Sequence, residues 1–267
     1  MAYNLEWMKK RMEELGIDPK RSLGQNFLVN TNACEKIVGR AIRYLPMQVV
    51  EVGPGLGALT EILKNKNQKP LLIELDHKIA QFWREQGFEV IEEDALRADW
   101  ALLLKEQTSI LISNLPYQIS SRLLVDRSVG PQCLRVMILM FQKEVAQRLM
   151  AKPRTADYGF LSVIGQTFWK MERLMELSSK DFYPPPKVAS QVLVFERRES
   201  PLDSPFIRFI KDAFQQRRKL LVSNLSNWGK ADVIRELLIT LGHNEKSRAE
   251  ELSSSSFHQL YDALQKP

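Results

Sequence analysis

Short apolar segments alternate with helix-patterned segments between Gln48 and Phe141, and this alternation constrains the fold more than any other feature of the chain. Each apolar run is followed by polar and apolar residues at helical spacing, which is typical of βαβ units and a parallel sheet. The runs are QVVEVG, PLLIEL, FEVIEED, TSILISN and CLRVMILMF. The pattern predicts a doubly wound α/β sheet that binds its ligand at the carboxyl edge.

The segments on either side of this alternation have other patterns. Leu5 to Leu15 has the spacing of an amphipathic helix, and a second helix is expected from about Asn32 to Tyr44. KMERLMELS and SQVLVFERR are predicted to be late strands that pair antiparallel at the sheet edge, and only helical patterns follow them. We therefore expect a large domain over residues 1–200, with 1–45 as an N-terminal helical segment, and a small all-helical domain over 201–267.

Composition excludes several classes of protein. The 267 residues are 44% hydrophobic and 26% charged, as in a globular chain rather than a disordered or rod-like one. Two cysteines and three scattered histidines predict neither a disulfide framework nor a metal site. The amino terminus has no apolar leader, and the most apolar run, VMILMF, is too short to cross a bilayer. We expect a cytoplasmic protein without membrane contacts.

Three glycines, Gly53, Gly55 and Gly57, lie between the first predicted strand and the helix that follows it. Backbone amides at a helix N-terminus can approach a ligand there without obstruction by a Cβ atom. The spacing is G-x-G-x-G, opened by Glu51, and differs from the G-x-G-x-x-G of dinucleotide sites. A nucleotide-like ligand is expected, with a tight turn that binds nothing as the alternative.

Acidic residues end the next two predicted strands. Glu74 lies 21 residues after Gly53, where a carboxylate can accept from both hydroxyls of a ribose. Asp94 ends the third strand and can accept from an adenine amine. Each acid has helix capping as its alternative role, but their order along successive strand ends favours a cofactor that contains a nucleoside.

The sequence SNLPYQ, Ser113 to Gln118, ends the fourth predicted strand at the same edge. The amine of a nucleobase is a poor nucleophile because its lone pair is delocalised, so an enzyme needs acceptors aimed at the amine hydrogens. Asn114 offers a side-chain carbonyl, Pro116 rigidifies the turn and exposes the Leu115 and Pro116 carbonyls, and Tyr117 offers a face for a flipped base. A proline turn with a buried tyrosine is the alternative.

Together these motifs resemble the ribosomal RNA adenine dimethyltransferases, of the bacterial small-subunit type called the kasugamycin-sensitivity methylase, over nearly the whole chain. The motifs that carry the resemblance are SLGQNFL (Ser22 to Leu28), EVGPGLGALT, IELD, EEDAL, NLPY, YGFLSV and FYPPPKVAS (Phe182 to Ser190). The resemblance implies a Rossmann-like class I sheet that binds S-adenosylmethionine, with residues 1–45 as a gating segment. It also implies a C-terminal RNA-binding helical domain.

The resemblance assigns roles to individual residues. The segment that matches GQNFL closes over the cofactor in this family, and Phe182 matches an aromatic residue that sandwiches the target base opposite Tyr117. Core packing before a proline loop is the alternative for Phe182. The implied cofactor contacts are Asn26, Leu28, Gly53, Gly55, Glu74, Asp94 and Asn114. The implied reaction is dimethylation of N6 on two adjacent adenosines in a hairpin loop near the 3′ end of 16S rRNA, within the small ribosomal subunit or its precursor.

The C-terminal third favours the small-subunit branch over the related resistance enzymes that methylate 23S rRNA of the large subunit. AFQQRRKLLVSNL resembles the F-x-x-R-R-K-x-L-x-x-N-L signature of that branch. Arg217, Arg218 and Lys219 either form a solvated helix face or bind phosphates, and Lys187 is a further expected RNA contact. Two other functions remain open: an NAD-dependent oxidoreductase, which the glycine spacing disfavours, and a ribosome-assembly RNA-binding factor with secondary catalysis.

The net charge of +6 is distributed unevenly. Residues 44–142 carry 10 basic and 12 acidic side chains, so the predicted cofactor core is not basic. Residues 1–43 carry 8 and 5, and residues 180–220 carry 9 and 5. The excess predicts that RNA is bound by the amino-terminal segment and by the region from Phe182 to Lys219.

Overall fold

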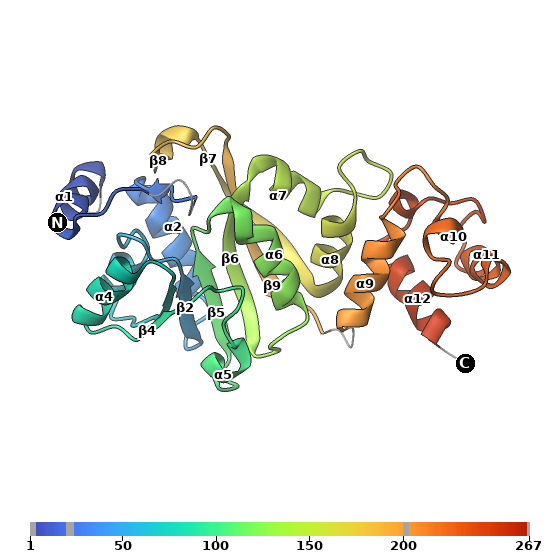
Figure 1. The fold of residues 1–267 in the computed structure, drawn as a ribbon, viewed down its shortest axis with the longest axis horizontal. Coiled ribbons are helices and arrows are strands. Elements are labelled where there is room, and N and C mark those ends of the chain that lie inside the picture. Colours follow the sequence, from blue (N-terminus) through green and yellow to red (C-terminus); the bar gives the residue numbers. More distant parts are fainter. Residues whose placement is uncertain (1–3, 20–23, 200–202, 266–267) are drawn as a thin grey trace. The chain divides into compact units, whose positions relative to one another are not determined.

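A seven-stranded sheet of order β4-β3-β2-β5-β6-β9-β7 forms the larger of two compact units (Figure 1). The computed structural model describes residues 4–19, 24–199 and 203–265. The strands are β2 (Gln48–Val52), β3 (Leu71–Glu74), β4 (Val90–Glu92), β5 (Ser109–Ser113), β6 (Leu134–Gln142), β7 (Trp169–Leu177) and β9 (Ser190–Arg197). The five strands predicted from the alternation are all present, and the predicted α/β class is confirmed.

In the parallel part of the sheet, the order of the strands reverses at β2. β2 pairs in parallel with β3 on one side, where Glu51 lies opposite Leu72, and with β5 on the other, where Glu51 lies opposite Ile112. β4 continues beyond β3, and β6 continues beyond β5. The carboxyl ends of β2 and β5 therefore flank a topological switch point, which is where open α/β sheets bind ligands.

The two late strands lie at the sheet edge, as predicted. β9 pairs antiparallel with β6 over seven residue pairs, from Val136 opposite Glu196 to Gln142 opposite Ser190. β7 follows β9 as the last strand. Ser190 therefore lies beside the carboxyl end of β6.

Helices cover the sheet, and all five residues of β5 are buried. α2 and α3 pack over Val49, Ile110 and Ile112, while α4 packs on β3 and α6 on β6. The bounds are α2 (Thr31–Ile42), α3 (Thr60–Asn65), α4 (His77–Glu85), α5 (Trp100–Leu104) and α6 (Tyr117–Ser128). The strands are thus held rigidly enough to fix the loops at their carboxyl ends.

The N-terminal helix α1 (Leu5–Leu15) is confirmed as amphipathic, because Met8 and Met12 are buried in one cluster with Trp83 of α4. Arg11 fastens it from outside, with its guanidinium 2.8 Å from a Glu61 carboxylate oxygen and 4.0 Å from the Trp7 ring centroid. The helix therefore packs directly beside the glycine loop that precedes α3.

A second, two-stranded sheet was not predicted. β1 (Phe27–Leu28) pairs antiparallel with β8 (Phe182–Tyr183), with Phe27 opposite Tyr183 and Leu28 opposite Phe182. It brings the GQNFL segment against the proline-rich FYPPPKVAS segment, although about 155 residues separate them in the chain. Two residues per strand are too few to produce a hydrophobic period.

The second compact unit is helical and consists of Glu144–Met171 with Arg198–Pro267. The expected division at residue 200, beside Ser200 and Pro201, lies outside the described residues, and the expected first domain included 144–171. Its helices are α7 (Lys143–Met150), α8 (Phe160–Phe168), α9 (Ser204–Ala213), α10 (Leu221–Asn224), α11 (Ala231–Thr240) and α12 (Ser254–Gln265), with a 3₁₀ turn at Ala249–Glu251. Another 3₁₀ turn, Ser179–Asp181, belongs to the first unit and precedes β8.

The helical pattern expected after the late strands is interrupted in this unit. The sequence from Phe206 to Leu225 has a continuous helical pattern, but the chain leaves α9 after Ala213 and forms turns up to Leu220 before α10 begins. Asn224 stabilises this arrangement, since its side-chain amide donates to the carbonyls of Ala213 at 2.7 Å and Gln216 at 3.1 Å. The basic RRK sequence therefore lies in a turn and not on a helix face.

Among the described residues, no helix is long and apolar enough to cross a membrane. The same residues contain no cluster of three or more His, Cys, Asp or Glu side chains that could hold a metal ion.

Candidate active site

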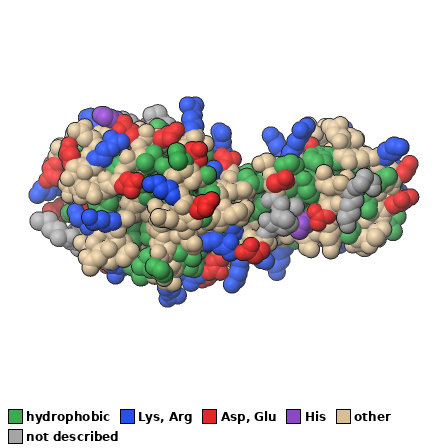
Figure 2. Space-filling model, turned by 90° about the horizontal axis from the view of Figure 1, so that it is seen from below, with side chains coloured by type: hydrophobic (Ala, Val, Ile, Leu, Met, Phe, Trp, Pro, Cys, Tyr) green, Lys and Arg blue, Asp and Glu red, His purple; other side chains and the backbone are tan. Residues whose placement is uncertain are grey.

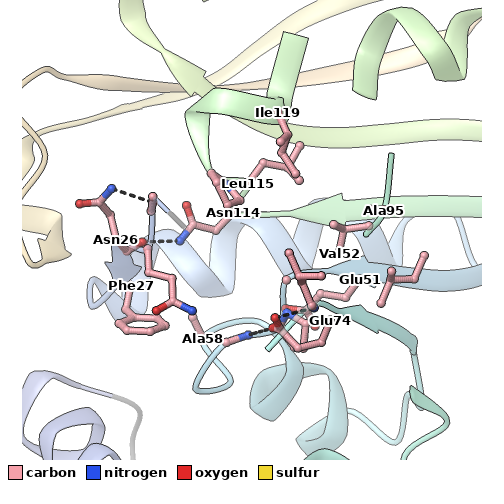
Figure 3. A pocket seen from close by; sticks show the side chains of 18 of the residues that line it. Asn26, Phe27, Glu51, Val52, Ala58, Glu74, Ala95, Asn114, Leu115 and Ile119 are labelled. Carbon is pink, nitrogen blue, oxygen red and sulfur yellow. Dashed lines mark hydrogen bonds between the residues drawn. The ribbon is translucent and has the colours of Figure 1, made fainter. Parts of the chain in front are cut away.

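A cavity of about 250 Å³ opens at the carboxyl ends of β2, β3 and β5, at the switch point of the sheet. Five segments of the first unit line it, and Figure 3 shows side chains from all of them converging on one space. Its walls include residues from Gly24–Leu28, Glu51–Leu59, Ile73–Leu75, Glu93–Ala95 and Asn114–Ile119. Of the predicted cofactor contacts, Asn26, Leu28, Gly53, Gly55, Glu74, Asp94 and Asn114 all line this cavity.

The glycine loop has a left-handed backbone at all three glycines, with φ of +65° at Gly53, +52° at Gly55 and +103° at Gly57. A Cβ atom at Gly53 would meet nothing within 4 Å, whereas one at Gly57 would lie 2.8 Å from the buried Trp83 ring. Gly57 is therefore required by packing. Gly53 keeps open the space into which a ligand can come close to the backbone.

Glu74 lies beneath this loop and is nearly buried, at 7% exposure. Its carboxylate accepts from the amides of Leu75 at 2.8 Å, Asp76 at 2.9 Å and Gly55 at 3.4 Å. Burial raises the pKa of Glu74 above its ordinary value, although these three backbone hydrogen bonds act in the opposite direction. The side chain is thus held at the cavity wall by donors of the backbone itself.

Asp94 follows β4 and occupies the next position along the sheet edge. One carboxylate oxygen accepts from the Leu96 amide at 2.9 Å, and the other lies 3.9 Å from the Arg97 guanidinium. The Leu96 hydrogen bond belongs to a turn and not to a helix, since the next helix, α5, is capped by Asp99. The alternative of helix capping therefore does not describe Asp94.

Glu51 lines the cavity as well, although its sequence position predicted no role for its side chain. It is 2% exposed and accepts from the Thr60 hydroxyl at 2.7 Å. Complete burial, and to a lesser extent the charge of nearby Glu74, raise the pKa of Glu51 to about 8 even though the Thr60 hydrogen bond lowers it. The sequence signal that could have indicated a role for Glu51 was the presence of a carboxyl side chain inside an apolar strand, two residues before the first glycine.

Asn114 follows β5 and faces the GQNFL segment across the cavity (Figure 3). Its side-chain amide nitrogen donates to the backbone carbonyl of Asn26 at 2.9 Å, and the Asn26 side chain donates to the Gly24 carbonyl at 3.1 Å. Because only nitrogen can donate to a carbonyl, these contacts fix which end of the Asn114 amide is oxygen. The strand end itself is held by the Ser113 hydroxyl, which donates to the Val52 carbonyl.

The rest of the NLPY turn starts helix α6. Pro116 is the N-cap residue, and its carbonyl accepts from the Ile119 amide at 3.1 Å, so of the two carbonyls expected to be exposed this one is already engaged. Tyr117 is half-buried at the cavity, and its hydroxyl lies 2.5 Å from the Ser190 hydroxyl. Burial raises the pKa of Tyr117, opposed by the Ser190 hydrogen bond.

Phe182 is not where its predicted role requires it to be. It is 4% exposed, belongs to the same buried cluster as Leu28 and Val192, and is absent from the cavity lining. In this conformation the core-packing alternative describes Phe182, because pairing of β8 with β1 turns the ring into the sheet-covering core. A base that stacks opposite Tyr117 would require the β8 segment to move.

The predicted RNA contacts differ in what they touch. Lys187 is exposed in the loop between β8 and β9, and Arg218 and Lys219 are exposed in the turn after α9. Arg217 instead donates to the carbonyls of Ala156 at 2.9 Å and Tyr158 at 3.1 Å, and pairs with Glu250 at 3.2 Å. It is a cross-link within the helical unit.

Charge is mixed on the surface shown in Figure 2. Lys and Arg side chains are interspersed there with Asp and Glu, and no continuous basic field covers that face. This agrees with the modest net charge of +6. Individual basic loops, rather than the whole face, are the places to look for phosphate contacts.

Comparison with known proteins identifies the family. The profile of the family described as ribosomal RNA adenine dimethylase matches residues 17–266. This chain belongs to that family. It is therefore an rRNA adenine methyltransferase, and S-adenosylmethionine is its methyl donor. The resemblance that the NLPY and glycine motifs carried is thus confirmed.

Individual relatives agree with the family assignment. The chain is 46% identical to the ribosomal RNA small subunit methyltransferase A of Bdellovibrio bacteriovorus, over 98% of both chains. It is 39% identical to the protein of the same name from Desulfitobacterium hafniense, over 96% of both. The crystal structure of a dimethyladenosine transferase from Plasmodium falciparum has the same fold, with a TM-score of 0.74 at 23% identity, over 88% of this chain and 95% of that one.

The adenine dimethylase cavity fits its cofactor on structural grounds. The open side of Gly53, the Glu74 carboxylate beneath the loop and the second oxygen of Asp94 supply a close backbone approach and two acceptors in the order that a nucleoside needs. Apolar side chains such as Phe27 and Leu56 complete the wall.

Proposed function

We propose that this chain dimethylates N6 of two adjacent adenosines in a hairpin loop near the 3′ end of 16S rRNA, within the small subunit or its precursor, in the cytoplasm. Two relatives that match nearly the whole chain are named for the small subunit, which supports this substrate over large-subunit RNA. The basic turn that carries the F-x-x-R-R-K signature supports the same branch.

The observation that carries the chemistry is the hydrogen bond from the Asn114 amide to the Asn26 carbonyl. It leaves the Asn114 carbonyl oxygen as the acceptor that faces the cavity, and an acceptor is what an adenine amine needs. We assign the second acceptor to the Leu115 carbonyl, since that of Pro116 is engaged with Ile119. Two acceptors hold the amine hydrogens so that the nitrogen lone pair is less delocalised into the ring, and they stabilise positive charge as it develops on nitrogen.

Cofactor binding is assigned to the residues around the glycine loop. Gly53 and Gly55 would give backbone contacts, Glu74 would accept from the ribose hydroxyls, and Asp94 would accept from the adenine amine. Asn26 and Leu28 would close the cavity from the other side. The bound cofactor supplies a methyl group on a sulfonium, and no strong base is needed because the methylated nitrogen loses its proton to water.

RNA contacts are assigned to separate places on the two units. Tyr117 presents its ring at the cavity for the target base, with its hydroxyl held by Ser190. Lys187, Arg218 and Lys219 are exposed and would contact phosphates. Phe182 would join the base only after leaving its buried position. We assign Arg217 the role of holding the turn that presents Arg218.

The test is mass spectrometry of nucleosides after incubation of the protein and S-adenosylmethionine with unmodified small subunits, large subunits or naked RNA. We expect dimethyladenosine at two adjacent positions of small-subunit RNA. Dimethyladenosine only in the large subunit would overturn the proposed substrate. Binding of NAD without binding of S-adenosylmethionine would contradict the cofactor.

A further inference from the structure

Two motif segments far apart in the chain form one hydrogen-bonded structure. The segment Gly24–Leu28 forms a wall of the cofactor cavity, and the loop 182–190 leads from β8 to Ser190. Strands β1 and β8 join them in antiparallel pairing, which the Val29 amide extends by donating to the Asp181 carbonyl at 2.8 Å. We call this pair of segments with Asn30 and Asp181 the clip.

Side chains reinforce the clip at Asp181. The Asn30 side-chain nitrogen donates to one carboxylate oxygen of Asp181 at 2.7 Å, and the amide and hydroxyl of Ser178 donate to the other oxygen at 2.7 and 3.0 Å. Burial opposes the charge, but these three hydrogen bonds prevail and keep the pKa of Asp181 below its ordinary value. Asp181 is therefore an ionised acceptor that joins the two segments.

Asn30 has a second function that makes it a useful site for testing the clip. Its side-chain oxygen accepts from the Ala33 amide at 3.0 Å and thereby caps helix α2. The amide oxygen of Asn30 thus caps the helix, and the amide nitrogen donates to Asp181. A residue that keeps the cap but cannot donate would break the contact with Asp181 alone.

Packing prevents the two strands of the clip from moving independently. Leu28 and Phe182 are 0% and 4% exposed and belong to one buried cluster. Phe27 lies 3.0 Å from where a Cβ of Gly55 would be, so it closes tightly over the glycine loop. A displacement of the cavity wall must therefore displace β8.

Contacts return from the far end of the loop to the reaction site. The hydroxyls of Ser190 and Tyr117 lie 2.5 Å apart, and Asn114 of the same turn donates to the Asn26 carbonyl in the cavity wall. Two routes therefore connect the cofactor wall to the NLPY turn within the first unit. One is the direct hydrogen bond between Asn114 and Asn26, and the other runs through the clip and the loop 182–190 to Ser190 and Tyr117.

We infer that Asn30 and Asp181 are positioning residues that couple cofactor binding to RNA binding. A cofactor in the cavity favours one position of the wall, and through the clip the same position of the loop that carries Lys187 and ends at Ser190. RNA that binds this arrangement must in turn bind the cofactor-loaded protein more tightly, and linkage makes the effect reciprocal. The inference rests on the proposed function for the identity of the RNA.

The experiment measures the dissociation constant of S-adenosylhomocysteine for the full-length protein, with and without saturating unmethylated small subunits. We expect binding about tenfold tighter in their presence for the wild-type protein, within the usual range of coupling between sites. In Asn30→Asp the new carboxylate still caps α2 but repels Asp181, so the ratio should fall to within about twofold of unity.

A reciprocal exchange separates coupling from damage to the fold. In the double variant Asn30→Asp with Asp181→Asn, residue 181 donates to residue 30 and still accepts from Ser178, so the ratio should recover. Asp181→Asn alone should lose it. Asp99→Asn is the matched control, because Asp99 is also an N-cap, accepts from the Leu102 amide at 3.0 Å and touches neither the clip nor the cavity.

Two outcomes of the affinity measurement would overturn the inference. In the first, wild-type protein binds both partners but its affinity for S-adenosylhomocysteine is the same with and without small subunits. In the second, the affinity ratio in both single variants equals that of the wild type. Failure of the wild-type protein to bind small subunits contradicts the proposed substrate instead. Hydrogen–deuterium exchange then tests the clip alone. S-adenosylhomocysteine must protect the amides of residues 182–183 and 187–190 in the wild type and not in Asn30→Asp, and equal protection in both variants overturns the inference.

Discussion

The side-chain amide of Asn114 donates to the backbone carbonyl of Asn26 at 2.9 Å, and both residues line the cofactor cavity. This contact joins the turn that would bind the target amine to the segment that would close over the cofactor. It also determines the orientation of Asn114, since a carbonyl accepts from nitrogen only. The acceptor needed for the amine is therefore in place before either ligand binds, which is the preorganisation that electrostatic catalysis requires.

Replacing Asn114 should separate binding from methyl transfer. Asn114→Ala removes the acceptor, and we expect the single-turnover rate of labelled methyl transfer to fall by about 10²- to 10³-fold. Asn114→Asp keeps an acceptor but cannot donate to the Asn26 carbonyl, so its rate should also fall, by about tenfold or more. Asn26→Ala is the comparison variant: it keeps the backbone carbonyl that accepts from Asn114, so at saturating cofactor its rate should fall less than that of Asn114→Ala. A normal rate in Asn114→Ala would contradict the proposed role.

Two glycines of the loop should respond differently to a methyl group. Gly57→Ala places Cβ 2.8 Å from Trp83 at a left-handed φ of +103°, and we expect the free energy of unfolding to fall by about 3 kcal/mol or more. At Gly53 the Cβ meets nothing, so Gly53→Ala should lose only about 1–2 kcal/mol from backbone strain. It should instead weaken S-adenosylhomocysteine binding. Urea unfolding and calorimetric titration of both variants test this contrast.

Much of the fold and the cavity could be predicted because both depend on local sequence. Strand ends such as Glu74 and Asn114 converge because parallel strands share a carboxyl edge. The clip could not be predicted, since β1 and β8 contain two residues each and pair across about 155 positions. The burial of Phe182 follows from that pairing. Core packing was the alternative for Phe182 from the sequence, but the strand that pairs with it and buries it could not be predicted.

Other differences have equally specific causes. The helical period runs without a break through the RRK sequence, but α9 ends at Ala213, and the Asn224 side chain stabilises the turn by donating to the Ala213 and Gln216 carbonyls. Arg217 could not be told apart from Arg218 by sequence, because only the fold reveals which of them meets the carbonyls of Ala156 and Tyr158. Charge alone does not distinguish a cross-link from a ligand contact.

Glu51 should make the stability of the ligand-free protein depend on pH. Its folded pKa of about 8 lies above the ordinary value of 4.5, so the folded state holds an extra proton between these values and its stability falls as pH rises through this window. Glu51→Gln does not titrate. The free energy of unfolding of wild type minus that of Glu51→Gln should therefore decrease from pH 5 to pH 8, on the order of a few kcal/mol. Parallel pH profiles from chemical denaturation would contradict the buried proton.

The Tyr117–Ser190 hydrogen bond should orient the ring for the target base. Tyr117→Phe and Ser190→Ala each remove the bond and leave the ring, and we expect each to lower kcat/KM for small subunits by about fivefold, equivalent to roughly 1 kcal/mol. The double variant should be no worse than either single variant, because the same bond is lost. Tyr117→Ala also removes the stacking surface and should cost roughly 1–3 kcal/mol more. Additive effects of Tyr117→Phe and Ser190→Ala would exclude a shared role.

Arg217 and Arg218 are neighbours with opposite predicted phenotypes. Arg218 is exposed in the turn, so Arg218→Gln should weaken RNA binding and leave thermal stability unchanged. The plot of log affinity against log salt should become less steep, by about 1 unit of slope. Arg217→Gln breaks the contacts to Ala156, Tyr158 and Glu250 and should lower the free energy of unfolding by about 1 kcal/mol, a modest figure because half the side chain is solvated. Its salt slope should change less than that of Arg218→Gln. If Arg217→Gln lowers the slope by a full unit without loss of stability, Arg217 contacts phosphate and the assignment of the cross-link is wrong.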